Sequence, residues 1–350
     1  MSPPAVKYVQ LGKSGLRVSL PILGASSFGN PKWGATDEST QWILGEEQAL
    51  PILKAAWDRG INTIDTANLY SNGDSERIVG KFIEKYQIPR EEIVISTKCW
   101  ALVGKGPDHD IITSQFPAMS ERREYVNQSG LSRAAIFHAV EGSLARLKTS
   151  YIDLLHIHRF DFTVPPEETM KALHDLVQSG KVLYIGASSM RAWQFALLNE
   201  VAEKHNWTKF VSMQNEYSLL YREEEREMLP YCKFHGIGVI PYSPLAGGLL
   251  ARPRESAETP RHKLSSSLGL IKMDEADTEI IKRVEEIAKK RDWTMSQVGL
   301  AWVQRNVTSP ISGANSVERV DQAIVDAEIT DEEAAYLGEP YQPKPVRGHA

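Results

Sequence analysis

The feature that most constrains the fold is an alternation of short apolar runs with helical patterns, from about residue 20 to about residue 327. Several runs, such as IVIST and VLYIGA, are rich in β-branched residues and apolar almost throughout. Parallel strands that are buried on both faces have this composition. The strands predicted in this way are Ile22–Ala25, Thr63–Asp65, Ile93–Thr97, Ile152–His158, Val182–Ala187, Phe210–Gln214, Gly238–Tyr242 and Ser309–Gly313.

The segments between these strands carry apolar residues at helical spacing. Two such stripes comprise Ile136, Val140, Leu144 and Leu147, and Ile280, Val284 and Ile287. Ser132 is the expected cap of the first helix, and Thr278 or Asp277 that of the second. Eight strands that are each followed by a helix predict an α/β protein of the (β/α)8, or TIM barrel, class.

A doubly wound sheet is the competing interpretation of the same alternation. Such a sheet normally has a glycine-rich phosphate turn after its first strand, whereas here that strand is followed by ASSFGNPKWG. The barrel is therefore favoured. Ahead of the first strand, KYVQLGKSGLRVSL alternates apolar and polar residues around a Lys-Ser-Gly turn, which predicts a β-hairpin that closes the bottom of the barrel.

Three long connections follow strands, and they cover Phe28–Glu46, Trp100–Leu131 and Leu245–Asp277. In a barrel they lie at the carboxyl ends of the strands, where the active sites of this fold are found. No shift in composition marks a second domain. We therefore expect residues 1–350 to form a single domain, with a core of about 7–327 and a C-terminal extension over 328–350.

Composition argues against several classes of protein. The formal net charge is -5 and the basic residues are spread along the chain, so no nucleic-acid footprint is evident. Two cysteines give no disulfide framework. The N-terminus lacks the pattern of a secretory signal, and no run of about 18 apolar residues predicts a membrane span. We expect a cytoplasmic protein, with a monomer as the default and an oligomer still open.

Four polar residues lie at or just beyond predicted strand ends. Asp65, Lys98 and His158 each close a strand, and Tyr70 lies five residues after Asp65. Each alone has an ordinary explanation, because a lone lysine is usually solvated and a strand-end aspartate often caps a helix. In a barrel, however, side chains from the ends of different strands converge at one mouth. There the four would form a proton-transfer site.

Such a set has a clear chemical use. A free tyrosine, with a pKa of about 10, is a poor proton donor near neutral pH. A neighbouring ammonium stabilises the phenolate, and a carboxylate holds that ammonium charged and in place. An imidazole can hydrogen-bond to a carbonyl oxygen and support its developing negative charge. No side chain supplies a hydride, so reduction of that carbonyl requires an organic cofactor.

The ordered motifs of the chain resemble those of the aldo-keto reductase superfamily. INTIDTANLYSNGDSERIVG is similar to the stretch with the family's Asp and Tyr, ISTK to the strand with its Lys, and SYIDLLHIHRFD to the segment that ends in its catalytic His. IGASS, MQNEYS and PYSPLAGGLL match three cofactor segments. The resemblance covers about residues 7–327, and IHRFD and GANSVERVDQA look like microbial and fungal branches of the family.

The resemblance implies NADPH-dependent reduction of an aldehyde or ketone to an alcohol. Asp65, Tyr70, Lys98 and His158 match the catalytic positions, with Tyr70 as the general acid. His156 lies two residues before His158 on the same strand face. We expect His156 to point into the barrel one layer lower, with a hydrogen-bonded role in the core.

The same resemblance implies a set of cofactor contacts. Ser188, Ser189 and Gln214 match the positions that hold the nicotinamide carboxamide, and the family often has Asn where Ser189 stands. Tyr242 matches the aromatic residue that stacks on the ring. The remaining implied contacts are Ser243, Leu245 and Gly247 in the pyrophosphate loop, and Gly313, Asn315, Ser316, Arg319 and Gln322 in the C-terminal segment.

The C-terminal cofactor segment, ISGANSVERVDQAI, departs from the best-known pattern of the family. Many relatives have Lys where Gly313 stands, for the 2′-phosphate of NADPH, and Asn where Ala323 stands, for the adenine. Arg319 does match the family's phosphate-binding arginine, and a planar guanidinium suits a phosphate. NADPH (NADP+) is therefore the expected cofactor, and the missing lysine leaves use of NADH open.

The substrate pocket is expected on the long loops. Phe28, Trp33, Trp100 and Tyr125 are candidates for an apolar wall, although each has the alternative of packing its own loop. Arg159 stands where some branches have Trp after the catalytic His. A roomy and partly apolar pocket would suit bulky aromatic or polycyclic ketones as well as simple aldehydes.

Two other functions stay open from the sequence. Potassium-channel β subunits are similar cofactor-bearing barrels that retain the four residues and serve as regulatory partners, but this chain shows no evident channel-docking feature. A barrel isomerase or metal hydrolase is the other alternative. Its metal site needs more ligands than His156 and His158, so we expect no metal.

Overall fold

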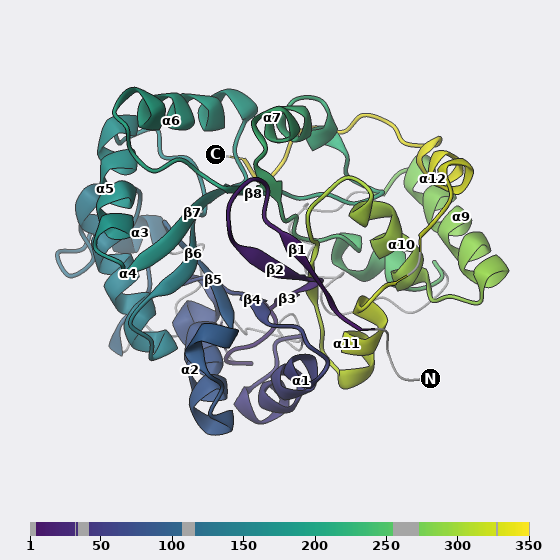
Figure 1. Ribbon diagram of the computed structural model, residues 1–350, viewed down its shortest axis with the longest axis horizontal. Coiled ribbons are helices and arrows are strands. Elements are labelled where there is room, and N and C mark those ends of the chain that lie inside the picture. Colours follow the sequence, from purple (N-terminus) through teal and green to yellow (C-terminus); the bar gives the residue numbers. More distant parts are fainter. Residues whose placement is uncertain are drawn as a thin grey trace.

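The computed structural model describes residues 5–31, 33, 42–106, 116–254, 273–326 and 328–349. Eight parallel strands form its centre (Figure 1). In the order in which they pair, they are β10 (Ile311–Gly313), β3 (Ile22–Gly24), β4 (Thr63–Asp65), β5 (Val94–Cys99), β6 (Ile152–Ile157), β7 (Val182–Ser188), β8 (Ser212–Gln214) and β9 (Gly238–Val239).

Backbone hydrogen bonds join the two ends of this sheet. The N–H of Thr308 donates to the carbonyl of Val239 at 2.8 Å, and the N–H of Ile311 donates to that of Pro241 at 2.9 Å. Because these bonds connect β9 to the segment of β10, the sheet closes on itself. The predicted (β/α)8 barrel is confirmed.

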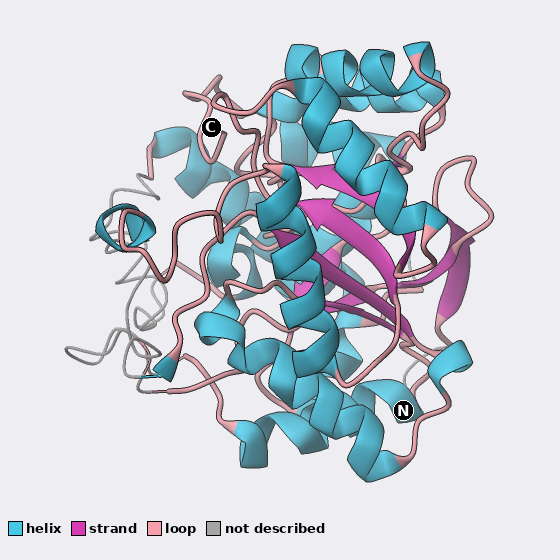
Figure 2. Ribbon diagram, turned by 90° about the vertical axis from the view of Figure 1, so that its left-hand side faces the viewer, coloured by secondary structure: helices cyan, strands magenta, loops and turns pink. Residues whose placement is uncertain are grey.

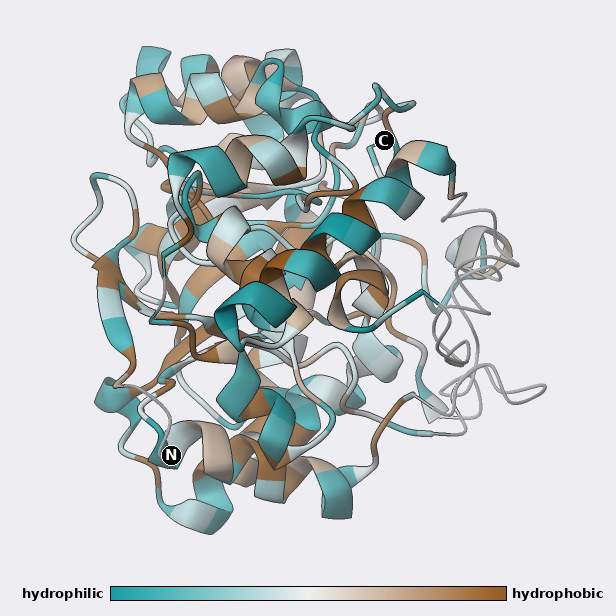
Figure 3. Ribbon diagram, turned by 90° about the vertical axis from the view of Figure 1, so that its right-hand side faces the viewer, coloured by the Kyte–Doolittle hydropathy of each residue, from teal (hydrophilic) through white to brown (hydrophobic). Residues whose placement is uncertain are grey.

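Helices surround the strands, as Figures 1 and 2 show. The longer ones are α1 (Glu46–Asp58), α2 (Asp74–Tyr86), α4 (Arg133–Leu147), α5 (Pro166–Gln178), α6 (Ala192–Lys204), α7 (Met228–His235), α9 (Glu275–Arg291), α10 (Met295–Gln304), α11 (Val317–Ala323) and α12 (Asp331–Gly338). A short helix, α3 (Phe116–Ser120), lies in the connection between β5 and α4. On the side of α9 to α12, hydrophilic and hydrophobic residues alternate along the helices (Figure 3), as expected for an outer ring with one face on the core.

The predicted helix caps have two different outcomes. The Ser132 hydroxyl accepts from the N–H of Ala135 at 3.2 Å, so the expected cap of α4 is confirmed. The expected cap of α9 is wrong, because the helix begins earlier, at Glu275. Asp274 is the cap, and its side chain and that of Asp277 each accept from the other's backbone N–H, which satisfies two N–H groups at once.

The N-terminal hairpin is confirmed, with β1 (Lys7–Gln10) antiparallel to β2 (Arg17–Leu20). It lies against the amino ends of the barrel strands, because Ser19 N–H donates to the Thr63 hydroxyl and the Ser309 hydroxyl donates to the Ser19 carbonyl. The carboxyl ends of the strands are therefore left to the site. No helix in the described part of the chain is long and apolar enough to cross a membrane.

Candidate active site

A buried ion pair occupies the carboxyl ends of β4 and β5. The Lys98 ammonium donates to Asp65 Oδ2 at 2.6 Å and to the Thr66 carbonyl at 2.8 Å. The side chains are 1% and 3% exposed, respectively. Asp65 Oδ1 accepts from the Ser96 hydroxyl and from Gln214 Nε2, each at 2.9 Å. Both carboxylate oxygens therefore accept hydrogen bonds, which fixes the orientation of the carboxylate and with it the position of the Lys98 ammonium.

The pKa of Lys98 reflects two opposed effects. Burial lowers it, because a charged ammonium is costly to desolvate. The attraction of Asp65, with a further contribution from Tyr70, outweighs burial, and the net shift is upward. Lys98 is therefore a cation throughout the physiological range.

Tyr70 follows β4 and begins a short 3-10 turn, η2 (Tyr70–Gly73). Ser71, Asn72 and Gly73 have φ values of 45°, 52° and 90°, so the chain turns sharply just after the tyrosine. The turn leaves the half-buried Tyr70 ring with its centroid 5.0 Å from Lys98 Nζ.

His158 completes the group from the end of β6. Its ring stands edge-on to that of Tyr70, with the centroids 6.2 Å apart at an interplanar angle of 83°. Burial, followed by the charges of Arg159 and Lys98, lowers the pKa of His158 well below its ordinary value. The ring is therefore neutral, and its buried Nδ1 has no hydrogen-bond partner within the described part of the chain. The structure thus brings together all four predicted catalytic residues.

The residues expected at the carboxamide end of a cofactor lie together beside this group. The Ser188 hydroxyl donates to the Gln214 carbonyl at 2.8 Å, and the Ser189 hydroxyl donates to the Tyr242 hydroxyl at 3.2 Å. Ser189 has a φ of 47°. Burial and the charge of Glu216 raise the pKa of Tyr242 to about 12, so the ring stays uncharged. Gln214 has a second task that the sequence did not predict, since its side-chain nitrogen holds Asp65.

The loop expected at the pyrophosphate has an unusual backbone. Ser243 has a φ of 54°, and Leu245 precedes the turn η7 (Ala246–Ala251). Its first three residues, Ala246, Gly247 and Gly248, have φ values of 49°, 67° and 101°. The N–H of Ala246 donates to the Ser243 carbonyl at 2.8 Å and that of Gly248 to the Leu245 carbonyl at 2.9 Å, so the turn is held by its own backbone.

Two guanidinium groups lie near each other, that of Arg252 after the turn η7 and that of Arg319 in α11. Ser316 caps α11, and its hydroxyl accepts from the N–H of Arg319, whose side chain donates to Gln322. Burial and the nearby charge of Arg319 lower the pKa of Arg252. In the described ranges, neither arginine forms an ion pair with a carboxylate. Arg252 is a candidate anion contact that the sequence reasoning missed, because only the fold brings it to Arg319.

Gly313 and Asn315 lie on the exposed surface just ahead of α11. Gly313 ends β10, with the strand residue Gly24 as its register partner. An exposed position between the strand end and the helix cap is where a cofactor phosphate can approach backbone N–H groups. The predicted contacts Gly313, Asn315, Ser316, Arg319 and Gln322 thus lie in one continuous segment.

The four predicted substrate residues fall into two groups. Phe28 is fully buried in the main core, and Tyr125 is 1% exposed and packs with Leu102 and Met119. These two side chains pack inside the protein and leave no surface for a substrate. Trp100 is 36% exposed and Trp33 is half-buried, so these two retain surface for a ligand.

Comparison with known proteins decides the family. Residues 22–341 match the model of the aldo/keto reductase family. The chain belongs to the aldo-keto reductase family. It is an oxidoreductase, and the members of its family use a nicotinamide dinucleotide.

Its relatives include several fungal proteins. An aldo-keto reductase of Fusarium vanettenii is 50% identical over 100% of this chain and 95% of its own length. Versiconal hemiacetal acetate reductase of Aspergillus parasiticus is 45% identical over 97% of this chain and 98% of its own length. A putative aryl-alcohol dehydrogenase of Schizosaccharomyces pombe is 48% identical, with 97% of both chains covered. The predicted resemblance to fungal branches of the family is confirmed.

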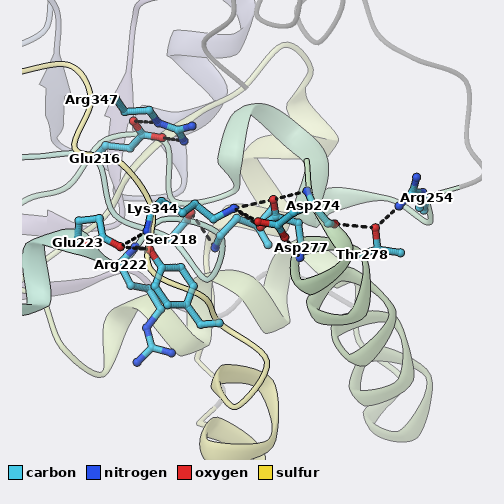
Figure 4. A network of polar contacts seen from close by, with 12 residues as sticks. Glu216, Ser218, Arg222, Glu223, Arg254, Asp274, Asp277, Thr278, Lys344 and Arg347 are labelled. Atoms are coloured by element: carbon cyan, nitrogen blue, oxygen red, sulfur yellow. Dashed lines mark hydrogen bonds and ion pairs between the residues drawn. The ribbon is translucent and has the colours of Figure 1, made fainter. Parts of the chain in front are cut away.

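In this aldo-keto reductase the C-terminal tail, residues 340–349, lies against the mouth of the barrel, which the sequence did not indicate. Figure 4 shows part of the polar network that holds it. Arg347 donates to both carboxylate oxygens of Glu216, and Lys344 donates to those of Asp277 at 2.6 Å. A methyl group added at Gly348 would lie 3.1 Å from the Tyr242 hydroxyl. The tail is therefore a wall beside the expected nicotinamide contacts.

We expect replacement of Lys344 with alanine to destabilise this aldo-keto reductase. Asp277 is only 4% exposed, and loss of its cation leaves a carboxylate buried with less compensation. The expected decrease in the free energy of unfolding is about 1–3 kcal/mol, measured by equilibrium unfolding in urea. Lys7→Ala is the matched control, because the Lys7–Asp326 pair is well exposed and its loss should leave the midpoint unchanged. Equal midpoints for both variants would contradict the prediction.

Proposed function

We propose that this protein is a cytoplasmic, NADPH-dependent reductase of aldehydes or ketones. The observation that carries the proposal is the arrangement of Tyr70 between a buried Asp65–Lys98 pair and a neutral His158. A tyrosine beside a fixed ammonium is suited to donating a proton to an oxygen, because the ammonium stabilises the phenolate that remains.

Each side chain has one step in this mechanism. His158, as a neutral ring, hydrogen-bonds the carbonyl oxygen of the substrate and orients it toward the Tyr70 hydroxyl. Tyr70 donates its proton to that oxygen as negative charge develops there. Lys98 stabilises the tyrosinate, and Asp65 keeps Lys98 charged. A nicotinamide cofactor, when bound, supplies the hydride that no side chain provides.

The described residues fit such a cofactor. The unpartnered Nδ1 of buried His158 marks a place for a ligand atom at one end. The neighbouring guanidinium groups of Arg252 and Arg319 suit phosphates at the other end. Ser188, Ser189, Gln214 and Tyr242 would hold the nicotinamide.

The names of the relatives favour a bulky or aromatic substrate. One is named as a reductase of versiconal hemiacetal acetate and another as a putative aryl-alcohol dehydrogenase. Trp33 and Trp100 retain surface at the mouth and are the side chains we propose to contact such a ring.

The proposal is tested by the rates of NADPH and NADH oxidation with a panel of aldehydes, quinones and aromatic ketones. We expect turnover that depends on the carbonyl compound and is faster with NADPH. Turnover that is negligible with every carbonyl, while the cofactor still binds, would overturn the proposal and favour a regulatory role.

Arg319→Ala is expected to raise the KM for NADPH by about 10- to 100-fold, the worth of a charge-assisted hydrogen bond to a phosphate. Its effect on the KM for NADH should be small, since NADH lacks the 2′-phosphate. Arg252→Ala should act in the same direction, and Arg17→Ala, on the hairpin, is the matched control. Equal losses with both cofactors would place Arg319 elsewhere than at the 2′-phosphate.

A further inference from the structure

A line of polar side chains crosses the interior of the barrel just below the catalytic residues. The interior of such a barrel is normally filled by branched apolar side chains. Here His156 of β6, fully buried, lies between two buried serines, with Nε2 2.8 Å from Ser212 Oγ of β8 and Nδ1 3.2 Å from Ser96 Oγ of β5. The prediction of a hydrogen-bonded core position for His156 is confirmed, and the layer continues to Asp65 of β4 through the Ser96 hydroxyl.

The intervening strand, β7, makes room for this layer. Gly186 of β7 is the register partner of both His156 and Ser212. A Cβ at Gly186 would lie 2.3 Å from Ser212 Oγ and 2.5 Å from the His156 ring. Any larger residue would collide with the ring, so the glycine and the imidazole belong to one arrangement.

The hydrogen bonds of this layer have a single consistent direction. The hydroxyl of Ser96 donates its one proton to Asp65 Oδ1, so toward His156 it can only accept. Nδ1 of His156 must therefore carry a proton. Burial, with the charge of Lys98, lowers the pKa of His156 well below its ordinary value, so the ring is neutral and Nε2 is an acceptor. Ser212 then donates to Nε2. Each hydrogen bond of this layer therefore points toward Asp65, from Ser212 to His156, from His156 to Ser96 and from Ser96 to Asp65.

We propose that His156 is a positioning residue for catalysis, which fixes the Asp65 carboxylate through Ser96 and so aims Lys98 at Tyr70. Asp65 Oδ1 accepts from Ser96 and Gln214, and Oδ2 accepts from Lys98. If Ser96 lost its acceptor role toward His156, its hydroxyl would be free to rotate away from Oδ1. The carboxylate would then have one fixed contact fewer, and the position of the ammonium would be less constrained.

The direction of the hydrogen bonds can be tested without turnover. In protein labelled with ¹⁵N-histidine, His156 should appear as a neutral ring with its proton on Nδ1 and no titration between pH 5 and 8, identified by its loss in His156→Gln. Ser96→Ala should shift that Nδ1 signal. A proton on Nε2, or titration near the ordinary histidine pKa of about 6.5, would overturn the proposal whatever the enzyme reduces.

The kinetic consequence rests on the proposed function and is measured in the same reduction assay. We expect His156→Leu to lower kcat about 5- to 20-fold, the worth of one hydrogen bond in positioning, with little change in the substrate KM or in cofactor affinity. His156→Gln, whose amide can accept from Ser212 and donate to Ser96, should restore most of kcat. Ser309→Ala, which removes a 2.9 Å hydrogen bond of a fully buried serine at the other end of the barrel, is the matched control and should leave kcat unchanged.

A double variant separates positioning from a general loss of stability. Because His156 acts through Ser96, Ser96→Ala combined with His156→Leu should be no slower than Ser96→Ala alone. Multiplicative losses, equal kcat values for His156→Leu and His156→Gln, or a native kcat in His156→Leu would each overturn the proposal. Absence of turnover in the unmodified protein would instead contradict the proposed function. The ¹⁵N measurement would still show which ring nitrogen of His156 carries the proton, and so the direction of the hydrogen bonds.

Discussion

Replacing Tyr70 with phenylalanine is expected to lower kcat for carbonyl reduction by about 10²- to 10⁴-fold, the usual contribution of a positioned general acid. The substitution removes only the hydroxyl, and the ring keeps its edge contact with His158 and its place beside Lys98. The affinity for NADPH should therefore change little. The measurements are steady-state kinetics with one aldehyde and cofactor binding followed by fluorescence.

Tyr8→Phe is the control for the loss of a tyrosine hydroxyl. Tyr8 lies on the hairpin at the amino ends of the barrel strands, where its exposed hydroxyl donates to the carbonyl of Gly60, just after α1. The control should reduce the aldehyde at the native rate. A Tyr70→Phe protein that matched the control would remove Tyr70 from the role of acid.

The fold could be predicted because its signals are local. Buried parallel strands have apolar and β-branched sequences wherever they occur, and β4 lies at the predicted residues Thr63–Asp65. The predicted strand Gly238–Tyr242 is shorter in the structure and ends at Val239. Pairing nevertheless continues past Val239, because the N–H groups of Ile240 and Tyr242 donate to the carbonyls of Met213 and Asn215, each at 2.9 Å.

Much of the site could be predicted for a different reason. A barrel brings every strand end to one mouth, so Asp65, Lys98 and His158 could be placed together once their strands were found. Contacts that depend on the direction of side chains across the barrel could not be predicted from the sequence. Gln214 bonding to Asp65 and the line from Ser212 through His156 depend on which residues of β8 and β6 share a layer.

The C-terminal tail is unpredictable from sequence for a third reason. Residues 340–349 have no helical or strand periodicity, and they are held by separate polar contacts to distant acidic residues such as Glu216 and Asp277. Such pairs have no sequence spacing of their own. Arg252 and Arg319 are likewise neighbours only because the turn after β9 and the helix after β10 meet in the closed barrel.

The Asp65–Lys98 pair is expected to matter as much for stability as for chemistry. Asp65→Ala leaves the Lys98 ammonium, 1% exposed, without its counter-charge. Removal of one partner of a buried pair typically costs about 3–5 kcal/mol, and we expect that loss in equilibrium unfolding at pH 7. The exposed Lys54–Asp58 pair has the same 2.6 Å separation and provides the control, since Asp58→Ala should leave the midpoint unchanged.

The pH dependence of that loss identifies its cause. In the native protein the pKa of Lys98 is raised, so its stabilising contribution is complete below the unfolded value of about 10.4 and is lost only as pH rises through the higher folded value. In Asp65→Ala the lowering of the Lys98 pKa by burial is opposed only by the smaller contribution of Tyr70. The penalty for the charged ammonium should therefore shrink between pH 7 and pH 10 as Lys98 gives up its proton. Asp65→Ala combined with Lys98→Met should recover most of the stability at pH 7, because no buried charge is left. A deficit that stays constant with pH, or a double variant as unstable as Asp65→Ala, would show that lost packing and not the unpaired charge destabilises the protein.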